Sequence, residues 1–467
     1  MSIGSPIGWL PWGSEAFARA AREQKPVLLS ITASWCRACH EMDRTTYADE
    51  GVASVIRDAF VPIRVDTDRR PDINERYNLG GWPTTAFLTA RGDLLGGGTF
   101  VAADQMVGIL NRVAEAVRTR GAEITRAQTV AGSSEPPPSG EPPSPDALIA
   151  MVFDTFDEVH GGFGVAPKFP LTAPLHLALA VYEAQGEERY RQVVERTLDA
   201  IRDGGLHDTG QGGFYRYATT REWQLPHVEK LLETNAALLR AYAHATRVLG
   251  DDSYSRMAAE LVTYIRQHLS CPSGGYVGSE GDTIVYADSS AAASAALLAA
   301  STTLDDAGLG REALEQLERV ALASYRPGRG IAHCVDGAAR VSGLLTDYVA
   351  MIHALLDAKE ASDGEPYGML AEELAHYMLR MMWDEHSSGF FDRAHDAAEV
   401  GLLNERRKPF VANCEAARAL ARVARVSDEP DFLARAEAAA RAAAPYAATQ
   451  GPLAAHYLLA MRELSLR

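Results

Sequence analysis

The spacing of apolar residues divides the chain into two regions that meet near residue 120. In the first region, short apolar runs such as VLLSITA (27–33), AFVPIRVD (59–66) and TTAFLTA (84–90) alternate with amphipathic stretches. Short apolar runs bounded by turn residues favour buried strands, whereas apolar residues three to four positions apart favour helices. After a leading helix at 14–24, the pattern predicts the order β-α-β-α-β-β-α, closed by a helix at 103–119.

From residue 146 onward, apolar residues follow a helical period that glycine-aromatic turns interrupt. The turns are GGFG (161–164), GGFY (212–215), GGY (274–276) and GFF (389–391), with weaker glycine punctuation at 328–330 and 449–451. Two helix-length patterns separate each turn from the next, and single helices at 146–158 and 452–465 complete a set of twelve. Each turn follows the second helix of a pair, so all the turns lie on one side of the array. Six hairpins without strong end caps predict a closed (α/α)6 toroid, with the turns around one mouth.

Residues 125–145, between the two regions, are rich in proline, serine, glycine and glutamate and have no apolar period. This composition is typical of an extended linker. The sequence therefore predicts an α/β domain at 1–124, a linker at 125–145 and an all-α toroid at 146–467.

Charge and hydropathy narrow the classes of partner. The 467-residue chain has a formal net charge of −17 and no block of basic residues, which argues against nucleic acid and anionic membrane surfaces. Its apolar runs are shorter than the roughly 18 residues that a membrane-spanning helix requires. Residues 1–17 lack the pattern of a secretory signal. A cytoplasmic protein that binds neither nucleic acid nor membrane is therefore expected.

The first predicted strand leads into SWCRACHEM (34–42), which has three chemical interpretations. Cys36 and Cys39 form a C-x-x-C pair typical of a redox-active dithiol, and with His40 they also spell a c-type haem attachment site. The pair could instead be half of a zinc site. Haem attachment requires export, and zinc requires two more ligands, yet the next cysteine is Cys271. Redox chemistry is therefore favoured, with no metal and no cofactor besides the dithiol.

The place of this dithiol between a strand and a helix predicts its chemistry. The free N–H groups and partial positive charge of a helix N-terminus favour a thiolate. We expect Cys36, at the exposed tip, to attack, and Cys39, one turn into the helix, to resolve. Trp35, Arg37 and His40 flank the pair as candidate supporting residues. Arg37 adds a cation, and His40 either assists the thiolate or is a helix residue that points sideways.

Much of this first region resembles a known family. WGSEAFARA, KPVLLSITASWCRACHEMDRTTY, FVPIRVDTDRRPDIN and GGWPTTAFLTARGDLLGGGTF span most of residues 12–100. They are similar to the thioredoxin-like domain of thioredoxin-domain proteins of the YyaL and spermatogenesis-associated type. The resemblance implies a thioredoxin-like fold with a cis proline, Pro83, packed against the dithiol. Two departures, Ser30 in place of a buried acid and Ala38 in place of an aromatic residue, argue against fast general-purpose thioredoxin activity. A fold retained only for packing is the alternative.

The same family carries a barrel similar to those of N-acylglucosamine epimerases and glycosidases. The stretches that match here are GGFGVAPKFP (161–170), VERTLDAIRDGGLHDTGQGGFYRY (194–217) and EWQLPHVEKLLETNAALLRAY (222–242). The resemblance implies a barrel that binds or processes carbohydrate. Where family members carry a longer acidic insertion, this chain has only GGYVGSEGD (274–282).

Lysine usage singles out two residues of these barrel motifs. Only five of the 45 basic residues are lysines, and Lys168 and Lys230 lie in the strongest motifs. A desolvated lysine can lose its proton and act as a general base or contact a carbonyl group, which arginine cannot do. The alternative is that both lysines are ion-paired residues that brace neighbouring turns. His227 lies three residues before Lys230 on the same helical face, so these two are the catalytic candidates.

A polar and aromatic set around these residues is typical of sugar pockets, in which tryptophan stacks on a ring and charged groups bind hydroxyls. Its members are Lys168, Asp208, Arg216, Tyr217, Trp223 and Glu229, together with Asp347 at the start of a later inner helix. We expect the set to line one concave site at the mouth of the toroid. Four histidines within helical patterns are interpreted as packed or surface residues: His176, His244, His268 and His353.

Two functions therefore remain open. The first is a thiol–disulfide oxidoreductase that acts on a client protein and whose barrel binds a small molecule or carbohydrate. The second is a carbohydrate-active barrel, an epimerase, isomerase or glycosidase, with the first domain as a redox sensor or docking module. A non-enzymatic binding protein is a third alternative. Paired carboxylates would favour hydrolysis, and two histidines on opposite helices would favour epimerisation, for which the candidates are His160, His207 and His227.

Overall fold

The structure is a computed structural model, and it describes residues 6–131, 143–335 and 339–466. The chain forms two compact units. Unit 1 comprises Met1–Pro136 and His395–Arg406, and unit 2 comprises Pro137–Ala394 and Arg407–Arg467. Each unit has its own hydrophobic core, so the two are described separately.

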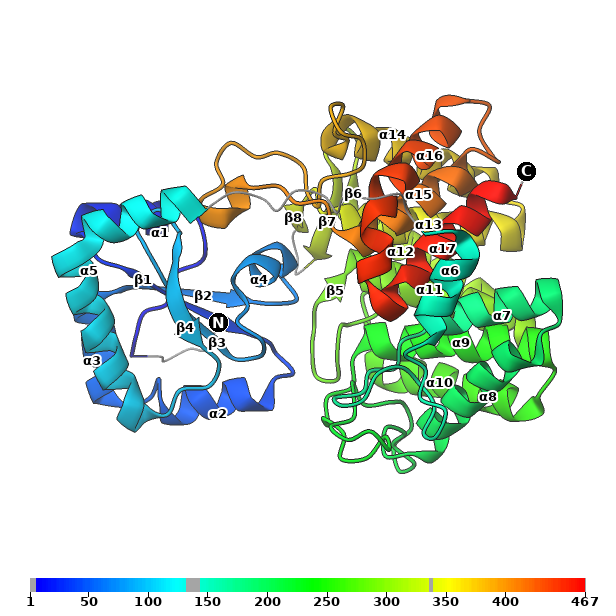
Figure 1. The fold of residues 1–467 in the computed structure, drawn as a ribbon, viewed down its shortest axis with the longest axis horizontal. Coiled ribbons are helices and arrows are strands. Elements are labelled where there is room, and N and C mark those ends of the chain that lie inside the picture. The colour runs from blue at the N-terminus through cyan, green and yellow to red at the C-terminus, as the bar shows by residue number, and fades with distance from the viewer. Residues whose placement is uncertain (1–5, 132–142, 336–338, 467) are drawn as a thin grey trace. The chain divides into compact units, whose positions relative to one another are not determined.

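Unit 1 is built on a four-stranded sheet with the strand order β2-β1-β3-β4 (Figure 1). The strands are β1 (Val27–Thr32), β2 (Val61–Asp66), β3 (Thr84–Leu88) and β4 (Leu94–Gly98). β1 runs parallel to β2 and antiparallel to β3. A parallel pair requires a crossover, which α2 (Arg37–Thr45) and α3 (Glu50–Ala59) provide. This topology confirms the predicted α/β domain.

Alternating side chains of β1 divide between two cores. Val27, Leu29 and Ile31 face the core that α1 (Ser14–Glu23) and α4 (Pro71–Tyr77) cover. Leu28 faces the opposite core, which α2, α3 and α5 (Ala103–Ala131) cover. Both faces of the sheet are therefore buried, which explains why its first strand is a continuous apolar run.

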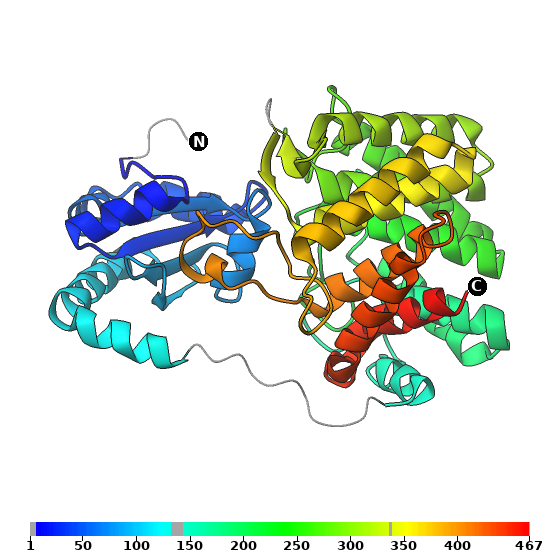
Figure 2. The ribbon, with the colours of Figure 1, turned by 90° about the horizontal axis from the view of Figure 1, so that it is seen from above.

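A segment from much later in the chain completes the first of these cores. Residues 395–406, which we call the strap, belong to unit 1 and contain the short 3₁₀ helix η2 (Gly401–Asn404). Leu403 is buried in the core that α1 and α4 cover. Figure 2 shows the strap, in orange, beside α4. The sequence-based division had assigned these residues to the toroid, because nothing in their local pattern shows that they leave it.

Hydrogen bonds and a close backbone approach hold the strap in place. Arg76 of α4 donates to two strap carbonyl oxygens, at 2.9 and 2.7 Å. The Tyr77 hydroxyl accepts the N–H of Leu402 at 2.8 Å and donates to the carbonyl of Gly92 at 2.7 Å. A Cβ atom on Gly92 would lie 2.5 Å from Cα of Gly401, and both residues have positive φ. Only glycine fits at these two positions.

The chain therefore passes between the units at three places, after residues 136, 394 and 406. Cleavage at a protease site engineered into residues 132–142 should give two fragments that separate in denaturing gels but elute together in native gel filtration. The strap, carried by the larger fragment, remains packed in unit 1. A Leu403→Asp variant places a charge in that core and should let the fragments separate after the same cleavage. Native separation of the unsubstituted fragments would show that the strap does not hold them.

Unit 2 is a closed ring of helices. Six inner helices each contact the next, in the order α7, α9, α11, α13, α15, α17 and back to α7. The inner helices are α7 (Ala173–Gln185), α9 (Leu232–Leu249), α11 (Ala287–Thr303), α13 (Leu345–Ser362), α15 (Phe410–Val423) and α17 (Ala454–Ser465). The outer helices are α6 (Pro145–Phe153), α8 (Glu188–Asp203), α10 (Asp252–Tyr264), α12 (Ala307–Ser324), α14 (Glu365–Met382) and α16 (Asp431–Ala443). The first and last helices, α6 and α17, form the sixth hairpin (Figure 1), which confirms the predicted (α/α)6 toroid.

Some connecting segments differ from the prediction. Helix α5 continues to Ala131, past the expected domain end at 124, and residues 132–142 of the predicted linker lie outside the described residues. A small sheet forms in the connections before α11 and α13, from β5 (Val285–Tyr286), β6 (Tyr325–Arg326), β7 (Gly330–Val335) and β8 (Ala339–Ser342). Among the described helices, none has the length and apolar character needed to cross a membrane.

Candidate functional site

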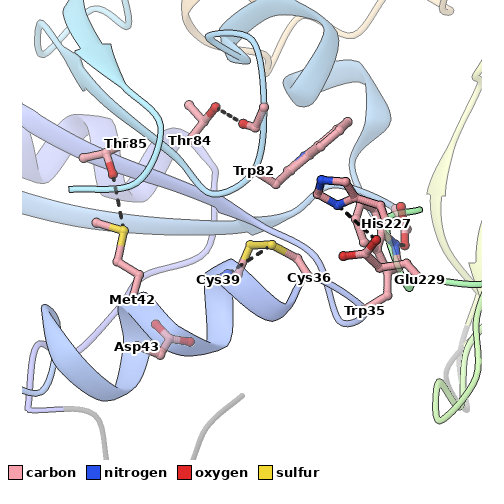
Figure 3. Close-up of a disulfide and its surroundings, with 12 residues drawn as sticks. Trp35, Cys36, Cys39, Met42, Asp43, Trp82, Thr84, Thr85, His227 and Glu229 are labelled. Atoms are coloured by element: carbon pink, nitrogen blue, oxygen red, sulfur yellow. Dashed lines mark hydrogen bonds and ion pairs between the residues drawn. A yellow bond between two sulfur atoms is a disulfide. The ribbon is translucent and has the colours of Figure 1, made fainter. Parts of the chain in front are cut away.

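Cys36 and Cys39 form a disulfide at the start of α2 (Figure 3). β1 ends at Thr32 and α2 begins at Arg37, so Cys36 takes the N-cap position of the helix. Cys36 is 3% exposed and Cys39 is 2% exposed, so the expectation that Cys36 lies at an exposed tip is wrong. The N–H of Cys39 donates to Sγ of Cys36 at 3.1 Å. In the reduced protein, the same N–H group and the partial charge of the helix N-terminus favour a thiolate at Cys36.

Two tryptophans pack against the disulfide, with their ring centroids 5.5 Å apart. Trp35 Nε1 donates to Asp68 at 2.6 Å, and Trp82 Nε1 donates to Asn74 of α4 at 3.1 Å. Figure 3 shows both indoles beside the sulfur atoms. The Trp82–Pro83 peptide is cis, as the resemblance implied. Side chains of unit 1 thus fix the surroundings of the dithiol.

The other predicted neighbours of the dithiol differ in exposure. Arg37 and His40 are exposed on α2. Ser30, in the place where the resemblance led us to look for a buried acid, is 1% exposed. Tyr47 and Thr85, whose hydroxyl oxygens lie 3.4 Å apart, are buried in the same part of the unit, and burial raises the pKa of Tyr47. Hydroxyl groups, which stay protonated near pH 7, therefore replace a titratable acid.

In unit 2, Lys168 and Lys230 bind aspartates of the glycine-aromatic turns. Lys168 Nζ lies 2.7 Å from Asp157 Oδ2, and both side chains are at most 1% exposed. Lys230 Nζ lies 2.7 Å from Asp208 Oδ2 and donates to the carbonyl oxygen of Gly212 at 2.8 Å. These contacts favour the bracing interpretation over catalysis, because each ammonium group points into its own turn.

A third lysine repeats the arrangement, since Lys408 Nζ lies 2.7 Å from Asp384 Oδ2. Backbone N–H groups just after each of the three aspartates donate to the same carboxylates. Burial alone raises the pKa values of Asp157, Asp208 and Asp384, but hydrogen bonds from Arg221 to Asp157, from the three lysines and from the backbone outweigh it and hold all three pKa values well below the ordinary value. Three of the chain's five lysines therefore brace turns of the toroid.

Backbone pairing completes these turns. In the second turn, His207 pairs with Phe214 across the glycines. The Asn235 side chain of the following inner helix bonds both the N–H and the carbonyl of Phe214. Asn413 does the same for Phe390. The repeated sequence pattern thus fixes where inner helices begin.

The remaining predicted binding residues separate into a buried and a partly exposed group. Trp223 is 1% exposed and donates its Nε1 hydrogen to a backbone carbonyl at 2.9 Å. Helix α9 begins only at Leu232, so His227 and Lys230 lie in the segment before it and do not share a helical face as expected. His227 stacks on Tyr217 with ring centroids 4.5 Å apart, and its Nδ1 lies 3.3 Å from Glu229. The Arg216 guanidinium lies 5.7 Å from the centroid of the same tyrosine ring. Because Trp223 and the two lysines are buried, the predicted set does not line one open concavity.

A polar network lies on the inner helices of the toroid, and we call it the axial network. His176 of α7 and His244 of α9 approach each other with their Nδ1 atoms 2.9 Å apart. Glu415 of α15 lies 3.6 Å from His353 of α13 and 2.6 Å from His456 of α17. Five of the six inner helices contribute to this network. The helical pattern around His176, His244 and His353 predicts only packed or surface residues and does not show that they join a network.

Arginines and a second carboxylate extend the axial network. Arg240 and Arg422 lie 2.8 and 2.7 Å from Asp357. Arg418 lies 2.8 Å from Glu415. Each carboxylate therefore holds at least one guanidinium group in a fixed orientation.

Burial sets the protonation of the axial network. It lowers the pKa of His244 to about 4 and that of His353 to about 3, so both rings are neutral near pH 7. Burial would raise the pKa of Glu415, but Arg418 and the hydrogen bond from His456 outweigh it and hold this pKa well below its usual range. Neutral imidazoles with such low pKa values are weak bases, but they can donate and accept hydrogen bonds with hydroxyl groups.

Sequence reasoning missed two further residues, at the mouth of the toroid. Asp347, a predicted binding residue, is fully buried at the start of α13, with one oxygen 2.8 Å from Nδ1 of His333. Asp288, in the first turn of α11, lies close to both. Asp288 could have been found from the sequence, because it lies in the first turn of an inner helix and inner helices begin at the mouth. His333 gave no signal, since it lies on a short strand within a connection.

Comparison with known proteins supports the α/β assignment of unit 1. A family model described as a protein of unknown function, DUF255 (Thioredox_DsbH), matches residues 2–133. Human spermatogenesis-associated protein 20 is 32% identical over 306 residues, which cover 59% of this chain and 39% of the human protein. The thiol:disulfide interchange protein DsbD of Ralstonia nicotianae is 34% identical over 82 residues, 17% of this chain and 14% of that protein. The chain thus spans well under half the length of these relatives.

Solved structures resemble the toroid. The cellobiose 2-epimerase of Bacillus thermoamylovorans B4167 superposes with a TM-score of 0.56 at 11% identity, covering 63% of this chain and 85% of that one. A family 105 glycoside hydrolase of C. acetobutylicum ATCC 824 superposes with a TM-score of 0.52 at 12% identity, covering 69% and 99%. At this level of identity the likeness concerns the fold.

Proposed function

We propose that unit 1 is a thiol–disulfide oxidoreductase that acts on a client protein through Cys36 and Cys39. The observation that carries the proposal is the position of the dithiol at the N-terminus of α2, with the Cys39 N–H directed at the Cys36 sulfur. Similarity to an 82-residue part of DsbD supports it.

The dithiol can carry the electron pair without a further cofactor. In the reducing direction, the Cys36 thiolate attacks a client disulfide, forms a mixed disulfide and releases one client thiolate. Cys39 then loses its proton and attacks Cys36, which releases the second client thiolate and forms the Cys36–Cys39 disulfide. The client gains the two electrons that the dithiol loses. A cellular thiol must afterwards reduce the disulfide again.

Selective alkylation tests this proposal. After mild reduction, iodoacetamide should label Cys36 faster than Cys39 near pH 7, because only Cys36 sits at the helix N-terminus as a stabilised thiolate. Cys271, a half-buried free thiol, serves as the internal reference and should react more slowly than Cys36. Peptide mass mapping over time measures the three rates. Equal, slow labelling of Cys36 and Cys39 would argue for a domain kept for packing.

We also propose that unit 2 binds a carbohydrate or a similar polyhydroxylated small molecule at the axial network. Histidines on neighbouring inner helices, with Glu415 in contact with two of them, carry this second proposal. Oriented arginines and carboxylates bind hydroxyl groups in pairs, and the neutral imidazoles can donate and accept hydrogen bonds. The toroid fold shared with cellobiose 2-epimerase supports a sugar ligand.

Thermal shifts with defined sugars test this second proposal. Cellobiose or mannose should raise the melting temperature of the wild-type protein in a saturable manner, since a ligand that binds only the folded state stabilises it. His353→Phe removes a polar partner from the network and should abolish the shift. Glu429→Gln, an exposed position, is the matched control and should keep it. A shift that survives His353→Phe would place binding elsewhere.

A further inference from the structure

Three side chains meet at the mouth of the toroid, where inner helices α11 and α13 begin. Asp288 lies in the first turn of α11, Asp347 in the first turn of α13, and His333 on β7. One ligand atom from each residue lies within 4.8 Å of the ligand atoms of the other two. The three lie on three separate elements, so the fold is what brings them together.

The local structure explains this convergence. β5 leads directly into α11, and β5 pairs with β7, so that Tyr286 lies opposite Cys334. His333 therefore sits beside the start of α11, with its ring 5.5 Å from the Tyr286 ring. β7 also contacts α13. The sheet thus places the His333 imidazole between the N-termini of α11 and α13, each of which carries an aspartate.

Two of the three residues of the cluster are buried, and Asp288 is partly exposed. Asp347 is 0% exposed and His333 is 3% exposed. Oδ1 of Asp347 lies 2.8 Å from His333 Nδ1, but Oδ2 is buried and has no hydrogen-bond partner among the described residues. Buried carboxylates without full pairing are rare unless a cation joins them.

From this geometry we infer that Asp288, His333 and Asp347 bind a divalent first-row transition metal ion, either Mn²⁺ or Zn²⁺. A ring nitrogen and two carboxylate oxygens form a ligand set suited to these ions. The two positive charges would balance the two carboxylates, and the unpartnered Asp347 oxygen would gain a ligand bond. Three protein ligands leave coordination positions open for water or for an oxygen atom of a bound molecule.

A second cluster of possible metal ligands lies among the described residues and is more exposed than the first. Glu372, His376 and Glu429 also place one ligand atom each within 4.8 Å of the others. His376 and Glu429 are exposed, and Glu372 already accepts a hydrogen bond from Ser427 at 3.0 Å. Water competes for ligands at an exposed site, so we expect this cluster to bind metal weakly at best.

Metal titration of the full chain tests the inference. Protein stripped with a chelator is titrated with MnCl₂ or ZnCl₂, with MgCl₂ as a control ion that prefers oxygen ligands. Bound metal is measured by equilibrium dialysis and elemental analysis, and the melting temperature is recorded in parallel. For wild type we expect saturation at about one tightly bound Mn²⁺ or Zn²⁺ per chain and a rise in melting temperature. His376→Gln should behave in the same way.

The variant Asp347→Asn tests directly whether Asp347 is a metal ligand. It removes one ligand charge but keeps the size of the side chain, so it should abolish tight binding and the metal-dependent rise in melting temperature. Without metal, its melting temperature should equal or exceed that of the stripped wild type, because one uncompensated buried charge is gone. Tight binding that persists in Asp347→Asn, is lost in His376→Gln, or is absent from the wild type with both ions would overturn the inference.

Discussion

A Cys36→Ser variant should lose thiol–disulfide exchange entirely, falling to the background rate of the assay thiol. The serine hydroxyl is not a thiolate and forms no disulfide, so neither the attack nor the mixed disulfide can occur. Cys39→Ser should fail differently. Its Cys36 thiolate can still attack once, but no second thiol resolves the intermediate, so mixed disulfides with the client accumulate. Reduction of a protein disulfide substrate, together with non-reducing gels, measures both outcomes.

Cys271→Ser is the matched control for these variants. Cys271 is a free, half-buried cysteine of unit 2, so its loss should leave the exchange rate unchanged. Trapping through Cys39 in the Cys36→Ser variant would reverse the assigned roles of the two sulfurs. Full activity of Cys36→Ser would remove the dithiol from the mechanism altogether.

Lys168→Met should lower the free energy of unfolding of unit 2 by about 3–5 kcal/mol, the usual effect of removing one partner from a buried ion pair. Asp157, 1% exposed, would keep its charge but lose the ammonium 2.7 Å away. Arg221 still contacts the same carboxylate at 2.7 and 2.9 Å, which places the loss toward the lower end of this range. Denaturant unfolding followed by circular dichroism measures the change.

Lys25→Met is the control for Lys168→Met. The Lys25–Glu23 pair, at 3.0 Å, has side chains 25% and 34% exposed, and breaking it should cost less than about 1 kcal/mol. If Lys168 instead served ligand binding, Lys168→Met would lower the free energy of unfolding no more than Lys25→Met does.

The aspartate–lysine ion pairs of the turns also predict that the free energy of unfolding falls at acidic pH. In the folded state, the pKa values of Asp157, Asp208 and Asp384 lie well below the ordinary value. Groups with depressed folded pKa values stabilise the protein above their unfolded pKa, near 4, and lose this stabilisation as the pH falls further. The effect of Lys168→Met should therefore shrink as the pH drops below about 4.

The parts of the structure that follow from local patterns were predictable. The strand at 27–33 and the C-x-x-C after it placed the dithiol at a helix N-terminus, because period and spacing act over a few residues. The glycine-aromatic turns indicated the hairpins of the toroid because they too are local patterns of a few residues. Bracing of a turn by Lys168 was one of two interpretations of the sequence, but its partner Asp157 was not identified, since the sequence shows a rare lysine but not what it contacts.

Features that depend on ring closure were not predictable in this way. His176, His244 and His353 lie in apolar helices, and a helical period alone cannot tell a histidine that faces the axis from one packed between helices. His333 and Asp288 approach each other only because β5 and β7 pair. The strap is the clearest case, because its local pattern does not show that Leu403 belongs to a core more than three hundred residues earlier in the chain.

The strap has a consequence for synthesis of the protein. A ribosome makes residues 1–136 long before residues 395–406, so the emerging unit 1 lacks Leu403 while most of the toroid is translated. Until then, the apolar side chains of α1 and α4 that Leu403 covers stay open to water and to chaperones. A transcript cut short before residue 395 would yield a first unit with an unfilled core, however complete its own strands and helices. Final assembly of unit 1 therefore awaits translation of residues 395–406, which ties its quality control to synthesis of most of unit 2.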